Sequence, residues 1–197
     1  LFLEVGRREM SVILPKKRAT NWMPPLIFLA GPVRGGGDWQ YQAYGELEKQ
    51  LVHFVAAIPM RYEKDYPGHP LLGKQIQGVS NDDPVFARQL AWENYHMLRA
   101  ARNGCLMFWL AFESEEHPHP GPEPFAMDSR REIGKWTAYL EQDPELRVVV
   151  GADPRFYGLD QIQRELNDTL GDGLHFPIHS TLEDTVLAAV ARAKSEV

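Results

Sequence analysis

The chain has 197 residues, of which 44% are hydrophobic and 24% are charged. This composition is typical of a globular protein and excludes a disordered or fibrous chain, and the length suits one domain with a sizeable core. The net charge of −6 and the isoelectric point near 5.6 argue against a protein that binds nucleic acid polymers, because phosphate backbones require clustered Lys and Arg.

The single cysteine, Cys105, cannot form an internal disulfide, and its apolar surroundings predict a buried, reduced thiol and a cytoplasmic location. No stretch approaches the ~20 apolar residues of a membrane span, and we expect neither a signal peptide nor a membrane partner. Residues 1–9 precede Met10 and are expected to be a misassigned start, an added remnant or a native extension without function. Residues 10–197 form the predicted single domain.

The first predicted elements alternate between strand and helix. Apolar runs predict an edge strand at 11–14 and a buried strand at 25–30. Apolar residues then recur at helical intervals over 39–52, and Asp38 stands where an N-cap belongs. A further apolar run predicts a strand at 53–59.

The middle of the chain begins with a segment over 60–84 that contains several Pro and Gly residues and no sustained period, and a loop of that length is usually functional. A helical pattern follows over 86–101. The continuous apolar run 105–112 is typical of a central parallel strand. Four prolines make the next segment irregular, and a helix is expected again over 129–140.

The remaining patterns predict a strand at 146–151, a helix at 159–170, a strand at 175–179 and a helix at 182–194. Strands that alternate with helices imply right-handed crossovers and a mostly parallel sheet. We therefore expect a flavodoxin-like or Rossmann-like three-layer α/β sandwich with about five strands. Ligands of such folds bind at the carboxyl ends of the strands.

One loop at such a strand end is the sequence GPVRGGGDW over 31–39. Its glycines, among them Gly31, Gly35 and Gly36, allow close approach of a ligand, and the following helix offers free N–H groups to an anion. Arg34 adds a cation suited to phosphate. The spacing matches neither the dinucleotide fingerprint nor the phosphate loop, so a flexible turn explains the local sequence equally well.

A second loop leads into MDSRREIGKW, where Asp128 and Glu132 stand near the expected start of a helix. Ser129 and Glu132 also fit the pattern S-x-x-E of a capping box, in which the glutamate binds the Ser129 backbone N–H. The local sequence alone favours this structural interpretation.

Four segments change that balance because of their order: IFLAGPVRGGGDWQ, AWENYHMLRAARNGCLMFWLAF, MDSRREIGKW and VVVGADPRFYG. Together they resemble the nucleoside 2-deoxyribosyltransferase superfamily over about residues 11–158. The first segment is also similar to the 2′-deoxynucleoside 5′-monophosphate N-glycosidases of that superfamily.

The resemblance implies roles for individual residues. Glu132, followed by Ile133 and Gly134, matches the E-[LI]-G motif whose glutamate attacks C1′ of the sugar and forms a covalent glycosyl intermediate. A helix N-terminus would keep that carboxylate ionised. The superfamily also supplies an acid from the helix before the central strand, for which Glu93 is our candidate, with Asn94 and His96 as alternatives.

The predicted catalytic residues are thus Glu132, Glu93 and Asp128. In the N-glycosidases the glycine loop holds the sugar and 5′-phosphate, and Phe28 stands where a tyrosine is common, which leaves ribose and deoxyribose both open. The predicted substrate-binding residues are Phe28, Gly31, Pro32, Arg34, Gly35, Gly36, Asp38, Trp39 and Ser129. His117 and His119 lie in a segment expected to be a solvated loop, and we predict no metal and no cofactor.

The sequence therefore predicts an enzyme that cleaves an N-glycosidic bond of a nucleoside or nucleotide and transfers the sugar to another nucleobase. Hydrolysis of a nucleoside 5′-monophosphate or a nucleoside to base and sugar is the alternative. A noncatalytic nucleotide-binding or sensor module and a phosphate binder whose Glu132 only caps a helix are the interpretations from other classes. The resemblance further implies a homo-oligomer.

Overall fold

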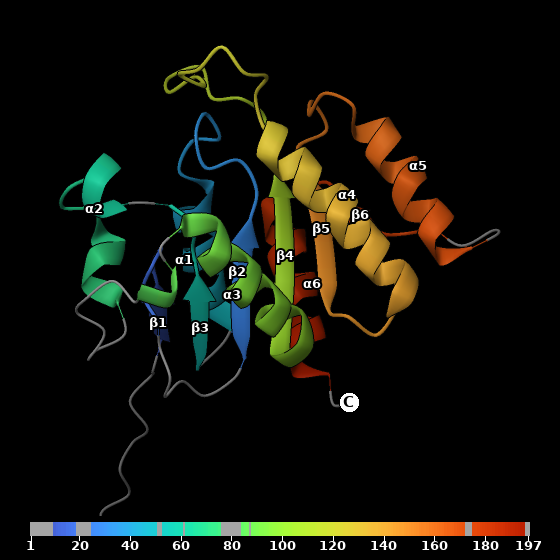
Figure 1. The fold of residues 1–197 in the computed structure, drawn as a ribbon, viewed down its shortest axis with the longest axis horizontal. Helices are drawn as coiled ribbons and strands as arrows, with labels where there is room; N and C mark the ends of the chain where they lie inside the picture. Colours follow the sequence, from blue (N-terminus) through green and yellow to red (C-terminus); the bar gives the residue numbers. More distant parts are fainter. Residues whose placement is uncertain are drawn as a thin grey trace, which may run out of the picture.

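The computed structural model describes residues 10–18, 25–50, 53–60, 62–75, 84–86, 88–171 and 175–195. Residues 1–9, the predicted N-terminal extension, lie outside these ranges. The fold is α/β, with a parallel sheet in the strand order β1-β3-β2-β4-β5-β6 (Figure 1). The described strands are β1 Met10–Ile13, β2 Leu26–Ala30, β3 Phe54–Ala57, β4 Gly104–Leu110, β5 Val148–Ala152 and β6 Ile178–His179.

The predicted flavodoxin-like or Rossmann-like fold class is therefore confirmed, and the described residues form six strands, slightly more than the predicted count of about five. The short sixth strand pairs only Ile178 and His179 with β5. The edge strand predicted at 11–14 is found one residue earlier, as β1, and the central strand predicted at 105–112 is found as β4, which starts one residue earlier and ends two residues earlier.

Helices follow the strands as expected, with shifted ends. The helix predicted over 86–101 begins later, at Gln89, because Pro84–Phe86 forms a separate 3-10 turn. The segment 60–84, expected to be irregular, contains short helical turns at its described positions. The helical elements are α1 Trp39–Gln50, α2 Tyr62–Asp65, η1 Pro70–Lys74, η2 Pro84–Phe86, α3 Gln89–Asn103, α4 Met127–Gln142, α5 Leu159–Leu170 and α6 Leu182–Lys194.

Two hydrophobic cores lie on opposite faces of the sheet, which makes the three layers. Along β2, Phe28 belongs to the core beneath α3, α4 and α5, whereas its neighbours Ile27 and Leu29 belong to the core beneath α1 and α6. This alternation follows from the two-residue period of a strand. Figure 1 shows α3 and α4 in front of the sheet and α6 behind it.

The start of α4 differs from the capping-box interpretation. The helix begins at Met127, its N-cap residue is Ala126 in the left-handed conformation with φ 59°, and no side chain caps it. Ser129 is buried inside the first turn and is not the N-cap. The capping box of Ser129 with Glu132 is therefore wrong, since the helix starts about three residues earlier than its pattern suggests.

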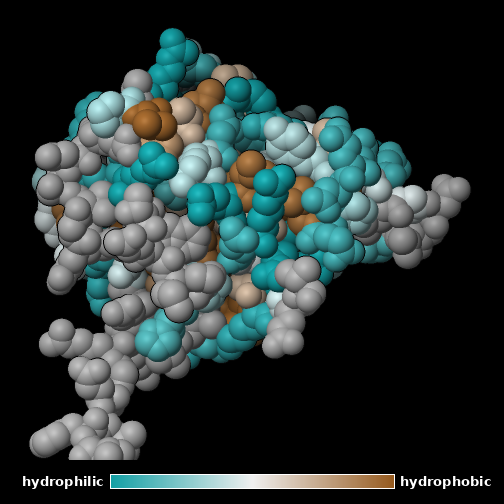
Figure 2. All heavy atoms as spheres, turned by 60° about the horizontal axis from the view of Figure 1, so that its bottom comes forward, coloured by the Kyte–Doolittle hydropathy of each residue, from teal (hydrophilic) through white to brown (hydrophobic). Residues whose placement is uncertain are grey.

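Within the described part of the chain, no helix combines the length and apolar character needed to cross a bilayer. On the face seen in Figure 2, hydrophilic residues cover most of the described surface, and hydrophobic residues form small patches between them. Such scattered patches are ordinary for a globular protein.

Candidate functional site

A cavity of about 650 Å³ opens at the carboxyl end of β2, between the N-terminal parts of α3 and α4. Its volume is in the range of small-molecule sites, and its place at the edge of a parallel sheet is where such sites form. The walls combine apolar residues with acidic side chains from both helices and with basic side chains from α4 and from the segments that follow β2, β3 and β4. The lining residues are Phe28, Ala30, Gly31, Pro32, Val33, Arg34, Pro59, Lys64, Gln89, Leu90, Glu93, His119, Glu123, Pro124, Ala126, Met127, Asp128, Ser129, Arg131 and Glu132.

Glu132 lies in the second turn of α4 and lines this cavity. Burial, and after it the charges of Glu93 and Asp128, together raise its pKa to about 7, against weaker opposition from Arg131 and Lys135. The expectation that the helix N-terminus keeps this carboxylate ionised is therefore wrong. The favourable effect of a helix dipole falls off beyond the first turn, and Glu132 is already past it.

Glu93 comes from the second turn of α3 and lines the same cavity. The side-chain amide of Gln89, one helical turn earlier, donates a hydrogen bond of 2.8 Å to Glu93 Oε1. The same amide donates to the backbone carbonyl of Pro59, also at 2.8 Å. Glu93 is thus the acidic residue of α3 that lines the cavity with Glu132, and a hydrogen-bond bridge connects it to Pro59, just beyond β3.

Neither alternative to Glu93 lines the cavity. Asn94 is exposed and accepts a hydrogen bond of 2.7 Å from Lys135 Nζ, which connects α3 to α4 at the surface. His96 is fully buried, its Nδ1 lies 2.9 Å from the Trp92 carbonyl oxygen, and burial lowers its pKa to about 4. The described geometry therefore favours Glu93 over both.

Asp128 and Ser129 also line the cavity, at the first turn of α4. Asp128 is exposed and lies 3.4 Å from the guanidinium of Arg131, an ion pair at the cavity rim. Ser129 is buried. Asp128 therefore contributes negative charge near Glu132 while remaining accessible to solvent.

The first half of the glycine loop faces the cavity with Gly31, Pro32 and Arg34. The indole of Trp39 donates a hydrogen bond of 2.9 Å to the Pro32 carbonyl and so holds the loop against the start of α1. Gly31 has φ 150°, and a Cβ there would collide with the carbonyl oxygen of Trp109. This position consequently requires glycine for both conformation and close approach.

The second half of the loop lies elsewhere. Gly35, Gly36, Asp38 and Trp39 are absent from the lining of the cavity that contains Glu132, so the structure does not bring these four predicted residues to it. Gly35 contacts the Pro-rich loop after β4. Its carbonyl accepts a hydrogen bond of 2.7 Å from the Ser114 N–H, and a Cβ on Gly35 would lie 2.8 Å from the His119 backbone nitrogen. The other three line a smaller cavity of about 370 Å³, together with Gly37, Gln42, Trp109, Ala111, Phe112, Glu113, Ser114, Glu115, Asp153, Arg155 and Leu182.

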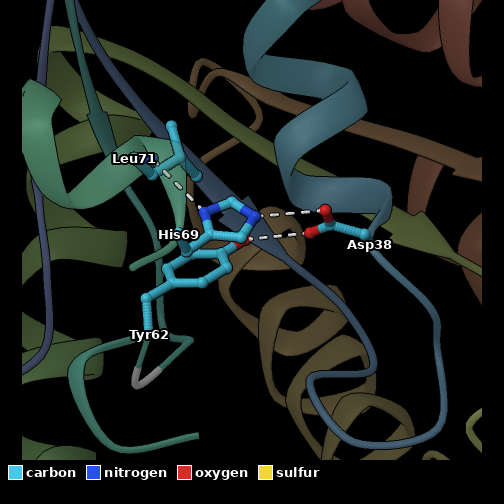
Figure 3. A network of polar contacts seen from close by, with 4 residues as sticks. All are labelled: Asp38, Tyr62, His69 and Leu71. Carbon is cyan, nitrogen blue, oxygen red and sulfur yellow. Dashed lines mark hydrogen bonds and ion pairs between the residues drawn. The ribbon is translucent and has the colours of Figure 1, made fainter. Parts of the chain in front are cut away.

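Asp38 has a structural explanation (Figure 3). One carboxylate oxygen accepts from the Tyr62 hydroxyl at 3.3 Å, and the other lies 3.2 Å from His69 Nε2. His69 stacks on Tyr62, and its Nδ1 accepts from the Leu71 N–H. Asp38 therefore fixes the segment after β3 against the start of α1, while its own backbone carbonyl accepts from the Gln42 N–H.

Some cavity residues escaped prediction from the sequence. His119, expected in a solvated loop, is largely buried and lies 3.8 Å from Glu123. Lys64 and Gln89 also line the cavity. The spacing of Gln89 and Glu93, four residues apart on one helical face, is a signal that the sequence offered. Among the described residues, no group of three or more His, Cys, Asp or Glu side chains is arranged to hold a metal ion.

Fold and site together define an α/β protein with a cavity that has cations at its mouth and whose described lining includes four carboxyl groups, those of Glu93, Glu123, Asp128 and Glu132. Clustered carboxyl groups, one of them with a pKa near neutrality, suit acid–base or nucleophilic chemistry. No protein-family model matches the chain, and no curated protein has significant sequence similarity to it.

Proposed function

We propose that the chain cleaves the N-glycosidic bond of a nucleoside or nucleotide through a glycosyl intermediate on Glu132, and transfers the sugar to another nucleobase. The observation that carries this proposal is the meeting of Glu93 from α3 and Glu132 from α4 in one cavity at the carboxyl end of β2. Departure of the base builds positive charge at C1′, which carboxylates stabilise and one of them captures.

In the first step, ionised Glu132 attacks C1′ and forms an ester, while the C1′–N bond breaks and its electron pair leaves with the base, which takes up a proton from solvent water. In the second step, a nitrogen of another base attacks C1′ and restores the Glu132 carboxylate. The attacking base loses a proton in this step. Glu93, as the second carboxylate, stabilises the positive charge in the first step, accepts the proton of the attacking base in the second and then releases that proton to solvent.

Hydrolysis of a nucleoside 5′-monophosphate is the second candidate. It shares the first step, and water replaces the acceptor base in the second. Two exposed cations of the cavity, Arg34 and Lys64, favour a substrate that carries a phosphate.

The test is incubation with ribonucleosides, deoxynucleosides and their 5′-monophosphates, with and without a second free base, followed by chromatography of the products. Acid quench and intact-protein mass spectrometry would detect a glycosyl adduct on Glu132. Glu132→Gln should abolish base release, whereas Glu141→Gln, at the exposed end of the same helix, should not. Binding of nucleotides without base release by the parent protein would instead support the noncatalytic module.

A further inference from the structure

Gln89 connects two elements that bound the cavity. Its side-chain nitrogen lies 2.8 Å from the Pro59 carbonyl oxygen, just beyond β3, and 2.8 Å from Glu93 Oε1 on α3. The orientation of the amide follows from chemistry: a backbone carbonyl can only accept, so the side that faces Pro59 must be the NH2 group. The same NH2 group then meets Glu93.

A donor at this position favours one form of Glu93. An ionised carboxylate accepts hydrogen bonds with both oxygens, and a charge-assisted bond to it is roughly twice as strong as a neutral one. The bond to Pro59 meanwhile fixes the amide in space, so the Glu93 side chain is held in one orientation at the cavity wall. Such supporting contacts are what keep a reactive group in position.

We propose that Gln89 is a positioning residue, which by bridging Pro59 and Glu93 keeps the Glu93 carboxylate ionised and oriented in the cavity that it shares with Glu132. This inference rests on the proposed function and sharpens it. An ionised Glu93 stabilises the positive charge at C1′ in the first step and accepts the proton of the incoming base or water in the second.

The test variant is Gln89→Met, which keeps the length of the side chain and removes both donor bonds. The chain offers a matched control in Gln163, whose side-chain nitrogen donates to Asn167 Oδ1 at 2.9 Å and to the Phe176 carbonyl at 2.8 Å. Gln163→Met therefore removes a bridge of the same kind from α5, away from the cavity. Thermal unfolding should show that both variants fold.

Two readouts separate positioning from mere stability. In proteins labelled with ¹³C at the glutamate carboxyls, the resonance of Glu93, assigned with Glu93→Gln, should titrate at a higher pH in Gln89→Met than in the parent and Gln163→Met. With the best substrate, kcat should fall about tenfold or more in Gln89→Met with a smaller change in KM, and Gln163→Met should retain the parent kcat.

The NMR titration needs no substrate, so it distinguishes failure of the inference from failure of the proposed function. An unchanged Glu93 titration in Gln89→Met overturns the positioning role, whether or not the protein releases bases. A shifted titration in a protein that releases no base supports the role of Gln89 and contradicts the proposed reaction. If Gln89→Met shifts the Glu93 titration but releases bases with the kcat of the parent, the role of Gln89 in catalysis is contradicted.

Discussion

Glu132 and Glu93 are electrostatically coupled across the cavity: after burial, the charge of Glu93 is the largest cause that raises the pKa of Glu132 to about 7. The two residues come from α4 and α3, and each helix delivers its carboxyl group from its second turn. A carboxyl group that changes its charge near neutral pH should influence both activity and stability in that range. Glu93→Gln tests the effect on activity, and Glu132→Gln tests the effect on stability.

The pH dependence of activity should report the ionisation of Glu132. With a nucleoside substrate, which carries no titrating phosphate, kcat/KM for base release should rise with pH through about 7 as the nucleophile loses its proton. Glu93→Gln removes the like charge, so its residual activity should reach the plateau at a lower pH. A kcat/KM that falls through pH 7 would instead assign Glu132 the role of proton donor.

Glu132→Gln should stabilise the protein above neutral pH. The folded pKa of about 7 lies above the ordinary glutamate value of 4.5, so the folded state binds the proton more tightly than the unfolded chain, and stability is lost as pH rises from about 4.5 through 7. Glutamine stays neutral and removes this loss, so the free energy of unfolding of Glu132→Gln should exceed that of the parent by up to about 3 kcal/mol at pH 8. Urea unfolding at pH 4.5 and 8 measures the difference, which should vanish at the lower pH. A variant less stable than the parent at pH 8 would contradict this prediction.

His96 should destabilise the fold in acid. Burial lowers its folded pKa to about 4 from 6.5, so the unfolded chain binds the proton more readily, and stability falls as pH falls from about 6.5 to 4. The loss is on the order of 3 kcal/mol. His96→Gln should flatten this part of the stability curve, and the exposed control His117→Gln should not. Equal acid slopes in parent and His96→Gln would show that other groups cause the loss.

Two glycines near the site should respond oppositely to alanine. Gly31→Ala places a Cβ against the Trp109 carbonyl at φ 150° and should cost more than about 2 kcal/mol. Gly134 lies in α4, where a Cβ meets nothing within 4 Å, so Gly134→Ala should stabilise by about 1 kcal/mol. Thermal unfolding of the two variants measures both effects. Similar shifts in melting temperature would contradict the close approach at Gly31.

Arg34 should distinguish monophosphates from nucleosides. Because its side chain is exposed at the cavity, Arg34→Met should raise KM for 5′-monophosphates about tenfold or more, with little effect on nucleosides. Steady-state kinetics with matched pairs of substrates measures this selectivity. The control is Arg164→Met on the exposed face of α5. Equal KM changes for both substrates would contradict a phosphate contact.

The sequence by itself determined the layered α/β fold, because strand runs and helical periods report which residues must be buried, and that information is local. It also predicted Gly31, Arg34, Glu93, Asp128 and Glu132 at strand-end loops and helix starts, and the structure brings these five together in one cavity. The ordered resemblance was needed to choose Glu93, since the spacing along α3 alone did not separate it from its neighbours.

Only the tertiary structure decided the electrostatics and the supporting contacts. Ser129 and Glu132 matched a capping box, but the left-handed Ala126 starts α4 earlier, and Glu132 lies partly buried near the charge of Glu93. Gln89 and Glu93 are neighbours on one helix, yet the Pro59 carbonyl that completes their bridge lies 30 residues before Gln89. Burial and such distant partners depend on how helices pack on the sheet, which a local pattern does not record.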